Sequence, residues 1–565
     1  MPQKNWPWLK SYPQEANWHE QIQPKPLYTL LESAAANYGG RPALDHLGKK
    51  YDWNTLWEMA CKFAKGLQAQ GVRKGDHIGL FLPNSPYYVV SYYGVLLAGA
   101  CVVNLNPLYA QEELKTLIED SQVEIVISVD LQMLYEKMYR MLHETRLKKL
   151  ILGSFSQTLP FPKNILFRTF KAKEIAKVED SPRILWYDTL LDNDGKPEIS
   201  PIDPRNDLAV IQYTGGTTGT PKGAMLTHEN VYANTMQCLS WFYVIDDTPA
   251  KMLGVLPFFH VFAMTAVMNF SVARGLEIIA LPRFELKETL KIIHKKKPRF
   301  FPAVPAIYNA INHSHLTDQY DLSSLKVCLS GGAPLPVEVK KTFEQKTGCV
   351  VIEGYGLSES SPVATVNPVQ GENLAGSIGL PVPATIIEII DPADKKTPMP
   401  IGERGELCIR GPQVMKGYWN KPEATADVLR PTGEGDRRLH TGDIAIMDAQ
   451  GYTYIVDRLK DMIITNGYKV YPRNVEEAVY QHPNVEECIV AGLPDKQRGE
   501  IVKIWIKPKE GRELAPDDLL EFLKDKISPM EIPKLYEFRD KPLPKTMIGK
   551  LSRKDVLAQE LEKKN

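Results

Sequence analysis

The residues with the clearest chemical capacity form a short stretch rich in hydroxyl groups and glycines that ends in a lysine. It reads Tyr-Thr-Gly-Gly-Thr-Thr-Gly-Thr-Pro-Lys-Gly from Tyr213 to Gly223. Backbone N–H groups of a glycine-rich turn can converge on an anion, the threonine hydroxyls add donors, and Lys222 adds a positive charge. This chemistry suits a polyphosphate, although the spacing is not that of a Walker loop. The apolar run from Leu208 to Gln212 predicts a buried strand that leads into the loop.

Five further short motifs follow the loop along the chain. They are Gly331-Gly332-Ala333-Pro334, Tyr355-Gly356-Leu357-Ser358-Glu359, Thr441-Gly442-Asp443, Asp457-Arg458-Leu459-Lys460-Asp461 and Pro544-Lys545-Thr546-Met547-Ile548-Gly549-Lys550. Together with the loop, and in this order, they resemble the motifs of the acyl-adenylate-forming superfamily, which includes acyl-CoA synthetases, luciferases and peptide-synthetase adenylation domains. The similarity runs from roughly Pro26 to Leu561 and is closest to the bacterial long-chain fatty acid CoA ligases.

The resemblance implies an ATP-dependent ligase that works in two steps. The joining of a carboxylate to a thiol in water is unfavourable, so the carboxylate first attacks the α-phosphate of ATP and gives an acyl-adenylate and pyrophosphate. CoA then displaces AMP and forms a thioester. Positioning and charge neutralisation provide most of the catalysis of such a transfer. The implied ATP contacts are Thr214, Gly215, Gly216, Thr217, Thr218, Gly219, Lys222, Gly331, Gly332, Ala333, Tyr355, Gly356, Ser358, Asp443 and Arg458.

Within this set, individual side chains suit individual parts of ATP and its metal ion. Glu359 and Thr214 offer oxygen ligands to Mg²⁺, a hard cation; the alternative is that Glu359 is an ordinary surface acid. Tyr355 offers a flat face for adenine. Asp443 can accept hydrogen bonds from both ribose hydroxyls, and Arg458 can donate to the same sugar or to phosphate. Ser358 stands where many members of the superfamily carry threonine, and it keeps the hydroxyl.

Three positions towards the C-terminus are implied to serve catalysis and domain movement. Lys550 lies in a lysine-rich tail, where a solvated surface charge is the competing interpretation. The resemblance implies that its ammonium group bridges the carboxylate and the α-phosphate. In the superfamily the small domain rotates after adenylation, and Lys460 stands at the pivot position. Gly467 stands where the backbone lets the pantetheine arm of CoA pass.

The residues that would hold the acid lie in a largely apolar segment, 255–273. It contains no Asp or Glu, which an amino-acid substrate would need as a partner for its ammonium group. The apolar side chains suit a hydrocarbon tail, although plain core packing gives the same pattern. His260 is by default a core histidine, and the resemblance implies that it lies beside the acyl carbonyl as a catalytic residue. We expect Phe259, Val261 and Met264 to line the acyl pocket, with Met264 where some long-chain members carry a gating tryptophan.

Two other functions remain open at this point. An aryl-CoA ligase of the coumarate type is the nearest alternative within the enzyme class. A non-catalytic nucleotide-binding protein, from a different functional class, would be expected to have lost Lys550 or Glu359, and both residues are present.

Length and composition indicate a globular, cytoplasmic protein with more than one domain. The 565 residues exceed what a single hydrophobic core usually serves. Lys plus Arg and Asp plus Glu both number 68, so no net field attracts nucleic acid. The seven dispersed cysteines, without a Cys-x-x-Cys pair, indicate reduced thiols. The sequence leaves open whether the protein forms a homodimer or makes peripheral contact with the inner face of the membrane.

Alternating helices and short apolar strands predict an α/β fold with largely parallel sheets. A β-rich subregion is expected around 386–410, and residues 153–207, rich in Pro, Asp and Lys, are interpreted as surface connections. The uncharged stretch Pro86 to Pro107 is long enough to cross a bilayer. Its tyrosines and its strand-like end favour a buried helix followed by a core strand instead.

These elements predict two domains joined by a short hinge. Residues 1–457 form a large N-terminal adenylation domain of layered α/β subdomains with the β-rich subregion. Residues 458–461 form the hinge, and residues 462–565 form a small, mobile α+β domain that carries the catalytic lysine. In this small domain Asn474 is expected to cap a helix from Val475 to Gln481.

Overall fold

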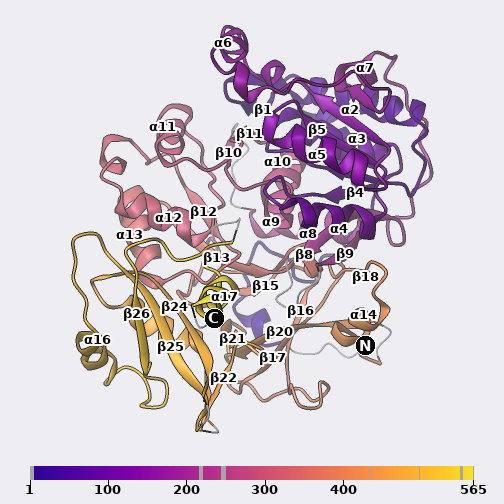
Figure 1. Ribbon diagram of the computed structural model, residues 1–565. Coiled ribbons are helices and arrows are strands. Elements are labelled where there is room, and N and C mark those ends of the chain that lie inside the picture. The colour runs from indigo at the N-terminus through magenta and orange to yellow at the C-terminus, as the bar shows by residue number, and fades with distance from the viewer. Residues whose placement is uncertain are drawn as a thin grey trace.

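The computed structural model describes residues 6–214, 221–243, 250–433, 436–466, 468–495, 497–546 and 551–563. Seven of the expected site residues lie outside these ranges, namely Gly215, Gly216, Thr217, Thr218, Gly219, Gly467 and Lys550. Their roles therefore stay predictions. The described chain forms a large α/β body and a smaller lobe made by its C-terminal residues (Figure 1).

An eight-stranded sheet forms the core of the N-terminal part of the body, in the order β18-β9-β8-β4-β3-β5-β6-β7. The neighbours from β8 to β7 are parallel, whereas β9 and β18 are antiparallel additions at one edge. Most residues of the parallel strands are apolar and buried, as a parallel sheet requires. The strands are β3 (His77–Leu80), β4 (Cys101–Asn104), β5 (Ile125–Val129), β6 (Lys149–Gly153), β7 (Ile184–Trp186), β8 (Leu208–Thr214), β9 (Lys222–Thr227) and β18 (Gly417–Tyr418).

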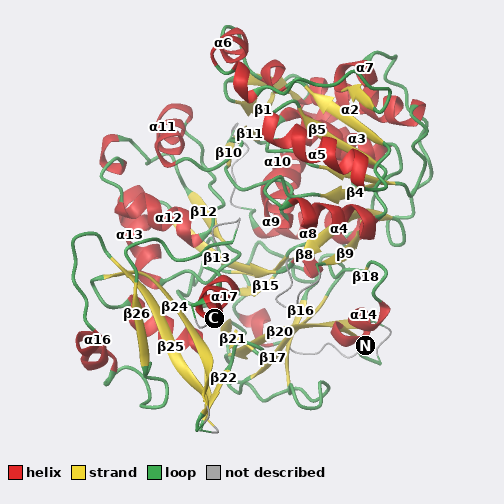
Figure 2. Ribbon diagram, viewed as in Figure 1, coloured by secondary structure: helices red, strands yellow, loops and turns green. Residues whose placement is uncertain are grey.

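Helices pack against this sheet in layers (Figure 2). Helix α3 (Pro86–Leu97) is buried along its whole length between the sheet and α2, and β4 follows it. The expectation of a buried helix and a core strand is therefore confirmed. In the described part of the chain, the helices lack the length and the apolar character needed to cross a membrane. Other helices of this part are α1 (Thr29–Tyr38), α2 (Trp53–Ala69), α4 (Gln111–Ser121), α5 (Gln132–Glu144) and α8 (His228–Trp241), whereas η1 (Pro7–Lys10) lies beside Gly451 of the C-terminal half of the body.

Two four-stranded sheets continue the body, in the orders β10-β11-β1-β2 and β12-β13-β14-β15. Single bridges through Phe300 connect them. Their strands are β1 (Pro42–His46), β2 (Lys49–Asp52), β10 (Lys251–Gly254), β11 (Glu277–Ala280), β12 (Val327–Ser330), β13 (Val350–Gly356), β14 (Val363–Val366) and β15 (Leu380–Pro381). The helices are α9 (Val261–Ala263), a π-helical segment η4 (Met264–Asn269), α10 (Phe270–Arg274), α11 (Leu286–Lys296), α12 (Pro305–His313), η5 (Thr317–Gln319), α13 (Val337–Thr347) and η6 (Ser358–Ser360).

The predicted β-rich subregion is an antiparallel sheet in the order β16-β17-β20-β19, with β21 also paired to β20. Its long strand β20 contains the Thr-Gly-Asp motif and pairs with β21, so that Asp443 lies opposite Arg458. The elements are β16 (Ile386–Ile390), β17 (Gly405–Arg410), α14 (Pro422–Val428), β19 (Leu429–Pro431), β20 (Arg437–Met447) and β21 (Thr453–Arg458).

The C-terminal lobe has its own sheet, β23-β22-β25-β24 with β26 beside β25, and its own apolar clusters. Its helix α15 begins at Pro472 and follows Tyr471, so the prediction that Asn474 caps this helix is wrong. Proline fits the first helical turn because its missing N–H needs no partner there. The elements are β22 (Ile463–Thr465), β23 (Tyr468–Val470), α15 (Pro472–Tyr480), β24 (Val485–Asp495), β25 (Gly499–Pro508), α16 (Pro516–Leu523), β26 (Leu535–Phe538) and α17 (Arg553–Glu562).

Residues 153–207 are more than surface connections, which corrects the sequence interpretation. Strand β7 closes one edge of the eight-stranded sheet by parallel pairing with β6. The strand has three residues, too few for a periodic pattern to show in the sequence. The same stretch also forms η2 (Phe155–Thr158), α6 (Lys163–Phe170), η3 (Ala172–Glu174) and α7 (Tyr187–Leu191).

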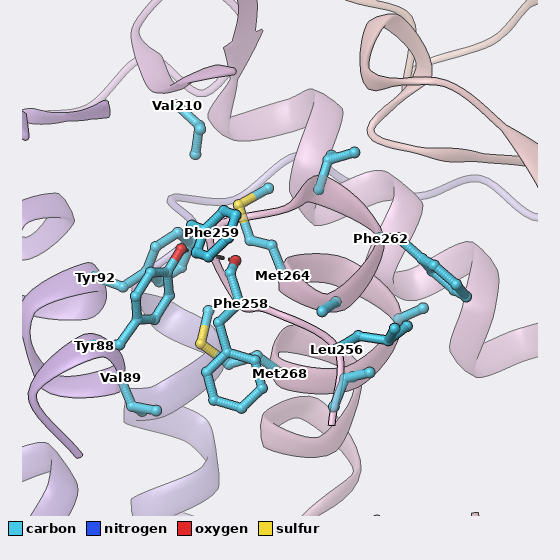
Figure 3. Close-up of a cluster of buried hydrophobic side chains, with 14 of the residues drawn as sticks. Tyr88, Val89, Tyr92, Val210, Leu256, Phe258, Phe259, Phe262, Met264 and Met268 are labelled. Carbon is cyan, nitrogen blue, oxygen red and sulfur yellow. Dashed lines mark hydrogen bonds between the residues drawn. The ribbon is translucent and has the colours of Figure 1, made fainter. Parts of the chain in front are cut away.

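One buried cluster holds the segment that follows β10 against the central sheet (Figure 3). The Tyr88 hydroxyl, from α3, donates to the Phe258 carbonyl at 2.8 Å. Met264 and Met268 lie in the same cluster as the rings of Phe258 and Phe259, and both methionines are fully buried. The backbone of this segment is therefore fixed by hydrogen bonds while its side chains pack in an apolar environment.

Candidate active site

A cleft of about 2150 Å³ lies between the large body and the C-terminal lobe. The carboxyl ends of β8, β12 and β13 open into it from one side. The middle of β20, around Asp443, and the end of β21, around Arg458, form another wall. Helices α15 and α17 of the lobe line the opposite side. Of the predicted site residues that the structure describes, the cleft is lined by Thr214, Lys222, Phe259, Val261, His260, Gly331, Gly332, Ala333, Tyr355, Gly356, Ser358, Glu359, Asp443, Arg458 and Lys460.

The two ends of the predicted phosphate loop face each other across an antiparallel pair of strands. Thr214 is the last residue of β8 and is paired with Lys222, the first residue of β9. The Thr214 hydroxyl donates weakly to the Lys222 carbonyl at 3.4 Å. The strand pairing therefore holds the two ends of the predicted loop, Thr214 and Lys222, together at the cleft.

Lys222 and Glu359 are brought together by a residue that sequence reasoning missed, Tyr418. The Tyr418 hydroxyl donates to Glu359 Oε1 at 2.7 Å, and the Lys222 ammonium lies 5.3 Å from the centre of the Tyr418 ring. Burial and the nearby Glu359 carboxylate raise the pKa of Tyr418, so its hydroxyl stays a donor. Tyr418 arrives through the two-residue strand β18 on β9, about 200 residues later in the chain, and has no local sequence signal.

A second group joins Tyr355, Asp443 and Arg458, which come from three different strands. The Tyr355 hydroxyl donates to Asp443 Oδ2 at 2.5 Å, and Arg458 Nε lies 3.3 Å from Asp443 Oδ1. Burial and the Asp443 charge raise the pKa of Tyr355, which keeps the phenol neutral. The structure thus brings together three residues that the sequence assigned to adenine, ribose and phosphate.

The stretch of β20 that carries Gly442 and Asp443 is held from behind by a buried carboxylate. Glu406 Oε1 accepts from the Gly442 N–H at 3.0 Å, and Glu406 Oε2 lies 2.8 Å from His440 Nδ1. Burial alone would raise the pKa of Glu406, but the bonds from His440 and Gly442 bring it below its usual value. Gly442 adopts φ +74°, a conformation that favours glycine. Glu406 and His440 therefore position this stretch from strands β17 and β20.

Cys408 completes a buried trio with Glu406 and His440 whose ligand atoms lie within 4.8 Å of one another. Burial, followed by the Glu406 charge, raises the pKa of Cys408 well above its usual value. The Glu406 oxygens engage His440 and the Gly442 N–H, so within this trio Glu406 and His440 support the stretch of β20 that carries Asp443.

Close backbone packing explains two of the motif glycines. A Cβ at Gly356 would lie 1.9 Å from the Pro362 carbonyl oxygen, so no other residue fits there. A Cβ at Gly331 would lie 3.1 Å from the Phe262 ring. Gly356 lets the end of β13 pack against the Pro362 backbone, and Gly331 leaves room for Phe262, two residues after His260.

The predicted acyl residues are placed differently from one another. His260 precedes α9, and its Nδ1 accepts from the Phe262 N–H at 3.3 Å. The Phe259 carbonyl accepts from Gln212 Nε2 at 3.2 Å, and Phe259 and Val261 line the cleft. Met264 is fully buried, and its sulfur accepts from Asn104 Nδ2 at 3.6 Å. Asn104 lines the cleft, whereas Met264 is not among the lining residues. Met264 therefore lies behind Asn104, one layer deeper than a residue that gates the acyl pocket would.

A small apolar void of about 20 Å³ lies beyond the cleft wall, between α8, η4 and the ends of β10 and β12. Leu329 lines both the cleft and the void. The other lining residues are apolar: Cys238, Phe242, Met252, Ala266, Phe270, Phe300, Pro302 and Val327. The sequence had pointed to the segment 255–273, which supplies Ala266 and Phe270, and it did not single out the others, because they come from four further segments.

The predicted hinge is surrounded by charges from the lobe. Arg553 of α17 lies 3.1 Å from Asp461, 3.6 Å from Asp457 and 2.7 Å from Glu476. Burial opposes the charge of Arg553, but these carboxylates raise its pKa overall. Lys460 is exposed, yet partial desolvation, followed by the Arg458 charge, lowers its pKa.

Comparison with known proteins identifies the family to which this chain belongs. A family model described as "AMP-binding enzyme" matches residues 31–419, and one described as "AMP-binding enzyme C-terminal domain" matches residues 474–550. The chain belongs to the AMP-binding enzyme family. The predicted membership of the acyl-adenylate-forming superfamily is thereby confirmed, as is the two-part α/β fold of the family.

Relatives in this family match over nearly the full chain. A long-chain-fatty-acid–CoA ligase of Bacillus subtilis (strain 168) is 46% identical over 560 residues, which cover 98% of both chains. One of Escherichia coli O6:H1 is 36% identical and covers 97% of both chains. A feruloyl-CoA synthase of an Amycolatopsis species is 33% identical and covers 91% of this chain and 95% of its own.

Solved structures of the family have the same fold. ATP-bound MatB from Rhodopseudomonas palustris superimposes with a TM-score of 0.79 at 26% identity, over 96% of this chain and 99% of its own. An anthranilate CoA ligase in complex with anthranoyl-AMP gives a TM-score of 0.83 at 23% identity, over 96% and 99%. At this identity the second comparison supports the fold alone.

Proposed function

We propose that this protein is a long-chain fatty acid–CoA ligase, an AMP-forming acid–thiol ligase. It activates a fatty acid with ATP through an acyl-adenylate, releases pyrophosphate, and then transfers the acyl group to CoA with release of AMP. The observation that carries this proposal is the full-length similarity, at 46% identity, to a ligase of that name. The cleft also supports the proposal, because it has polar residues that suit a nucleotide and apolar residues that suit a hydrocarbon chain.

In the first step, the nucleotide is held by groups fixed before it binds. Lys222 and the N–H groups of the loop after Thr214 neutralise the β- and γ-phosphates. Asp443 accepts from the ribose hydroxyls, because Tyr355 and Arg458 occupy only part of its capacity as an acceptor. Gly331, Gly332 and Ala333 lie beside Tyr355, Gly356 and Ser358 in the cleft lining and form the adenine side. Preorganised donors of this kind stabilise developing charge without reorganisation.

The donor set at the phosphate end fits Mg²⁺. Glu359 is a carboxylate with one oxygen engaged by Tyr418, and Thr214 adds a hydroxyl to the wall of the same cleft. Oxygen ligands of this kind suit a hard cation. When bound, Mg²⁺ would neutralise phosphate charge as pyrophosphate leaves. The hydrogen bond from Tyr418 orients the Glu359 carboxylate in the cleft.

The acid is placed by the segment after β10. His260 lies at the cleft wall next to Phe259 and Val261, where it can orient the carboxylate of the substrate. Lys550 is proposed to bridge this carboxylate and the α-phosphate during the attack. In the second step Lys460, at the family's pivot position, allows the lobe to rotate, and Gly467 lets the pantetheine arm reach the adenylate.

The interior beyond Leu329 favours a hydrocarbon tail. A chain that enters from the cleft meets Leu329 and then the void lined by Ala266 and Phe270. The void holds only about one water-sized sphere, so a long tail requires side chains around it to move. Unbranched methionine Met252 in its wall can adapt to different chains.

A second function, aryl-CoA ligase, is favoured by the similarity to the feruloyl-CoA synthase. Pyrophosphate release with ATP and CoA, measured against acids from acetate to oleate and including coumarate and ferulate, distinguishes the two. We expect the highest kcat/KM for medium- to long-chain acids, because each buried methylene contributes ~0.8 kcal/mol. A kcat/KM that is highest for coumarate or ferulate would replace the long-chain assignment by the aryl one.

A further inference from the structure

Helix α6 carries large apolar side chains on its exposed surface. Phe161, just before the helix, is 78% exposed, and Phe170, its last residue, is 81% exposed. Ile165 and Leu166 between them are about half exposed, and no residue of α6 is buried. Exposed apolar residues are ordinarily scattered singly, whereas contiguous groups mark interaction sites. Four of them within ten residues therefore call for an explanation.

The orientation of α6 is the reverse of that expected for a helix on a globular protein. Its protein-facing side is set by Arg168, whose Nε donates to Ser156 Oγ at 2.8 Å, and by Phe167, whose ring lies 5.3 Å from the Phe155 ring. Leu166 and Phe170, four residues apart, share the other side. A surface helix normally turns its apolar stripe inward. Figure 1 shows α6 at the top edge of the molecule, projecting beyond the central sheet.

The segment that carries these apolar side chains has an excess of positive charge, although Lys163 donates to the Leu47 carbonyl at 3.0 Å and Arg168 donates to Ser156. The segment 161–173 contains Lys163, Arg168, Lys171 and Lys173 and no acidic residue. Lys49 donates to the Gln157 carbonyl at 2.6 Å and adds its charge at the base of the helix. Glu174 pairs with Lys171 at 2.6 Å and offsets only one of these cations. Because charges are screened beyond about 10 Å in salt, this local excess matters even though the whole chain is neutral.

We propose that residues 161–173 form a membrane-docking surface that inserts Phe161, Leu166 and Phe170 into the headgroup region of an anionic phospholipid bilayer. Phe and Leu on one side of a short helix, with Lys around them, is the composition of helices that lie in the membrane interface. The lysines reach anionic headgroups while the aromatic rings enter below them. The proposed docking surface consists of α6 and its surroundings, and it is independent of the proposed ligase activity.

A second copy of the chain is the competing occupant, and the size of the surface speaks against it. Stable protein interfaces bury about 800 Å² on each partner, and α6 has only eight residues. Insertion into lipid needs no matching protein surface and works with a few side chains. The narrow, projecting shape of this edge suits lipid better than a second folded surface.

Vesicle flotation of the full-length protein tests the proposal. The bound fraction is measured with phosphatidylcholine vesicles that either contain or lack phosphatidylglycerol. The variants are the pair Phe161→Ser with Phe170→Ser, and the pair Lys171→Gln with Lys173→Gln. The matched control is the pair Ile199→Ser with Ile401→Ser, which removes exposed apolar side chains, 52% and 51% exposed, away from α6. Thermal unfolding of each variant checks that it is folded.

We expect the wild-type protein and the control pair to float with phosphatidylglycerol vesicles. The Phe pair should lower the partition coefficient by about tenfold or more, and the Lys pair should weaken binding chiefly at low salt. Absence of flotation for the wild type, or equal flotation of the wild type and the Phe pair, would overturn the proposal. A wild-type dimer in sedimentation velocity that the Phe pair dissociates would assign the surface to a second copy instead.

Discussion

The two ends of the cleft are built in different ways. At the nucleotide end, polar side chains at strand ends are fixed by hydrogen bonds and ion pairs, as in the group of Tyr355, Asp443 and Arg458. At the acyl end, a hydrogen-bonded backbone carries mainly apolar side chains, such as Leu329, Ala266 and Phe270 around the void, and the buried Met268 lies in the same segment (Figure 3). The difference indicates that the nucleotide end sets the reaction and the acyl end sets the substrate. Substitutions at one end should therefore leave the other largely unaffected.

The largest effect is expected from Lys550→Ala. Removal of a charge aimed at the transition state should slow acyl-adenylate formation by on the order of 10²–10³-fold. Thioester formation from a synthetic acyl-adenylate and CoA should be largely spared. Lys541→Ala, an exposed lysine of the same lobe, is the control. Equal losses in both half-reactions would remove Lys550 from the adenylation step.

The converse is expected for Lys460→Pro. Proline fixes φ, so a pivot that must change its backbone angles is frozen. Adenylation, followed by pyrophosphate release, should persist, while thioester formation should fall by about 10²-fold or more. If thioester formation continues at the wild-type rate, the lobe does not turn at Lys460.

Glu359→Gln tests the phosphate end in finer detail. The amide keeps the shape of the side chain but loses the charge that holds Mg²⁺, so the Mg²⁺ concentration for half-maximal rate should rise by about tenfold or more. Tyr418→Phe removes only the hydrogen bond to Glu359 and should give a smaller rise in the same titration. An unchanged Mg²⁺ dependence in Glu359→Gln would assign the metal to other ligands.

Ala266→Trp tests the acyl end alone. The larger side chain fills the void beyond Leu329, so kcat/KM for oleate should fall by about tenfold or more relative to octanoate. The KM for ATP should stay the same, because Ala266 lies away from the nucleotide groups. A parallel fall for both acids would indicate general damage to the core, and a changed KM for ATP would show that the two ends are coupled.

The smallest effect is expected for Glu406→Gln, which acts through the stretch of β20 that carries Asp443. The weaker acceptor should loosen Gly442 and raise the KM for ATP by about tenfold, while the KM for the acid stays constant. The control is Glu388→Gln on the neighbouring strand, which breaks ion pairs with Arg410 and Arg438 and does not contact Gly442. Equal effects of the two substitutions would reduce Glu406 to a contributor to stability.

Much of the fold and of the nucleotide end was predictable from the sequence. The run from Leu208 to Gln212 indicates its strand, and Pro86 to Pro107 indicates the buried helix and strand, because apolar runs of these lengths have few other folded outcomes. The three-residue strand β7 and the start of α15 at Pro472 were missed. In both places, tertiary packing and proline geometry outweighed the local pattern.

The sequence by itself determined the family and predicted the chemistry of the nucleotide end, because glycines and charged residues in fixed short motifs carry that chemistry locally. Only the tertiary structure decided which side chains complete the site. Tyr418 reaches Glu359, Glu406 reaches Gly442, and Leu329 joins the cleft to the apolar void through strand pairing between distant segments. Such contacts depend on register and packing across the fold, and no periodicity along the chain encodes them.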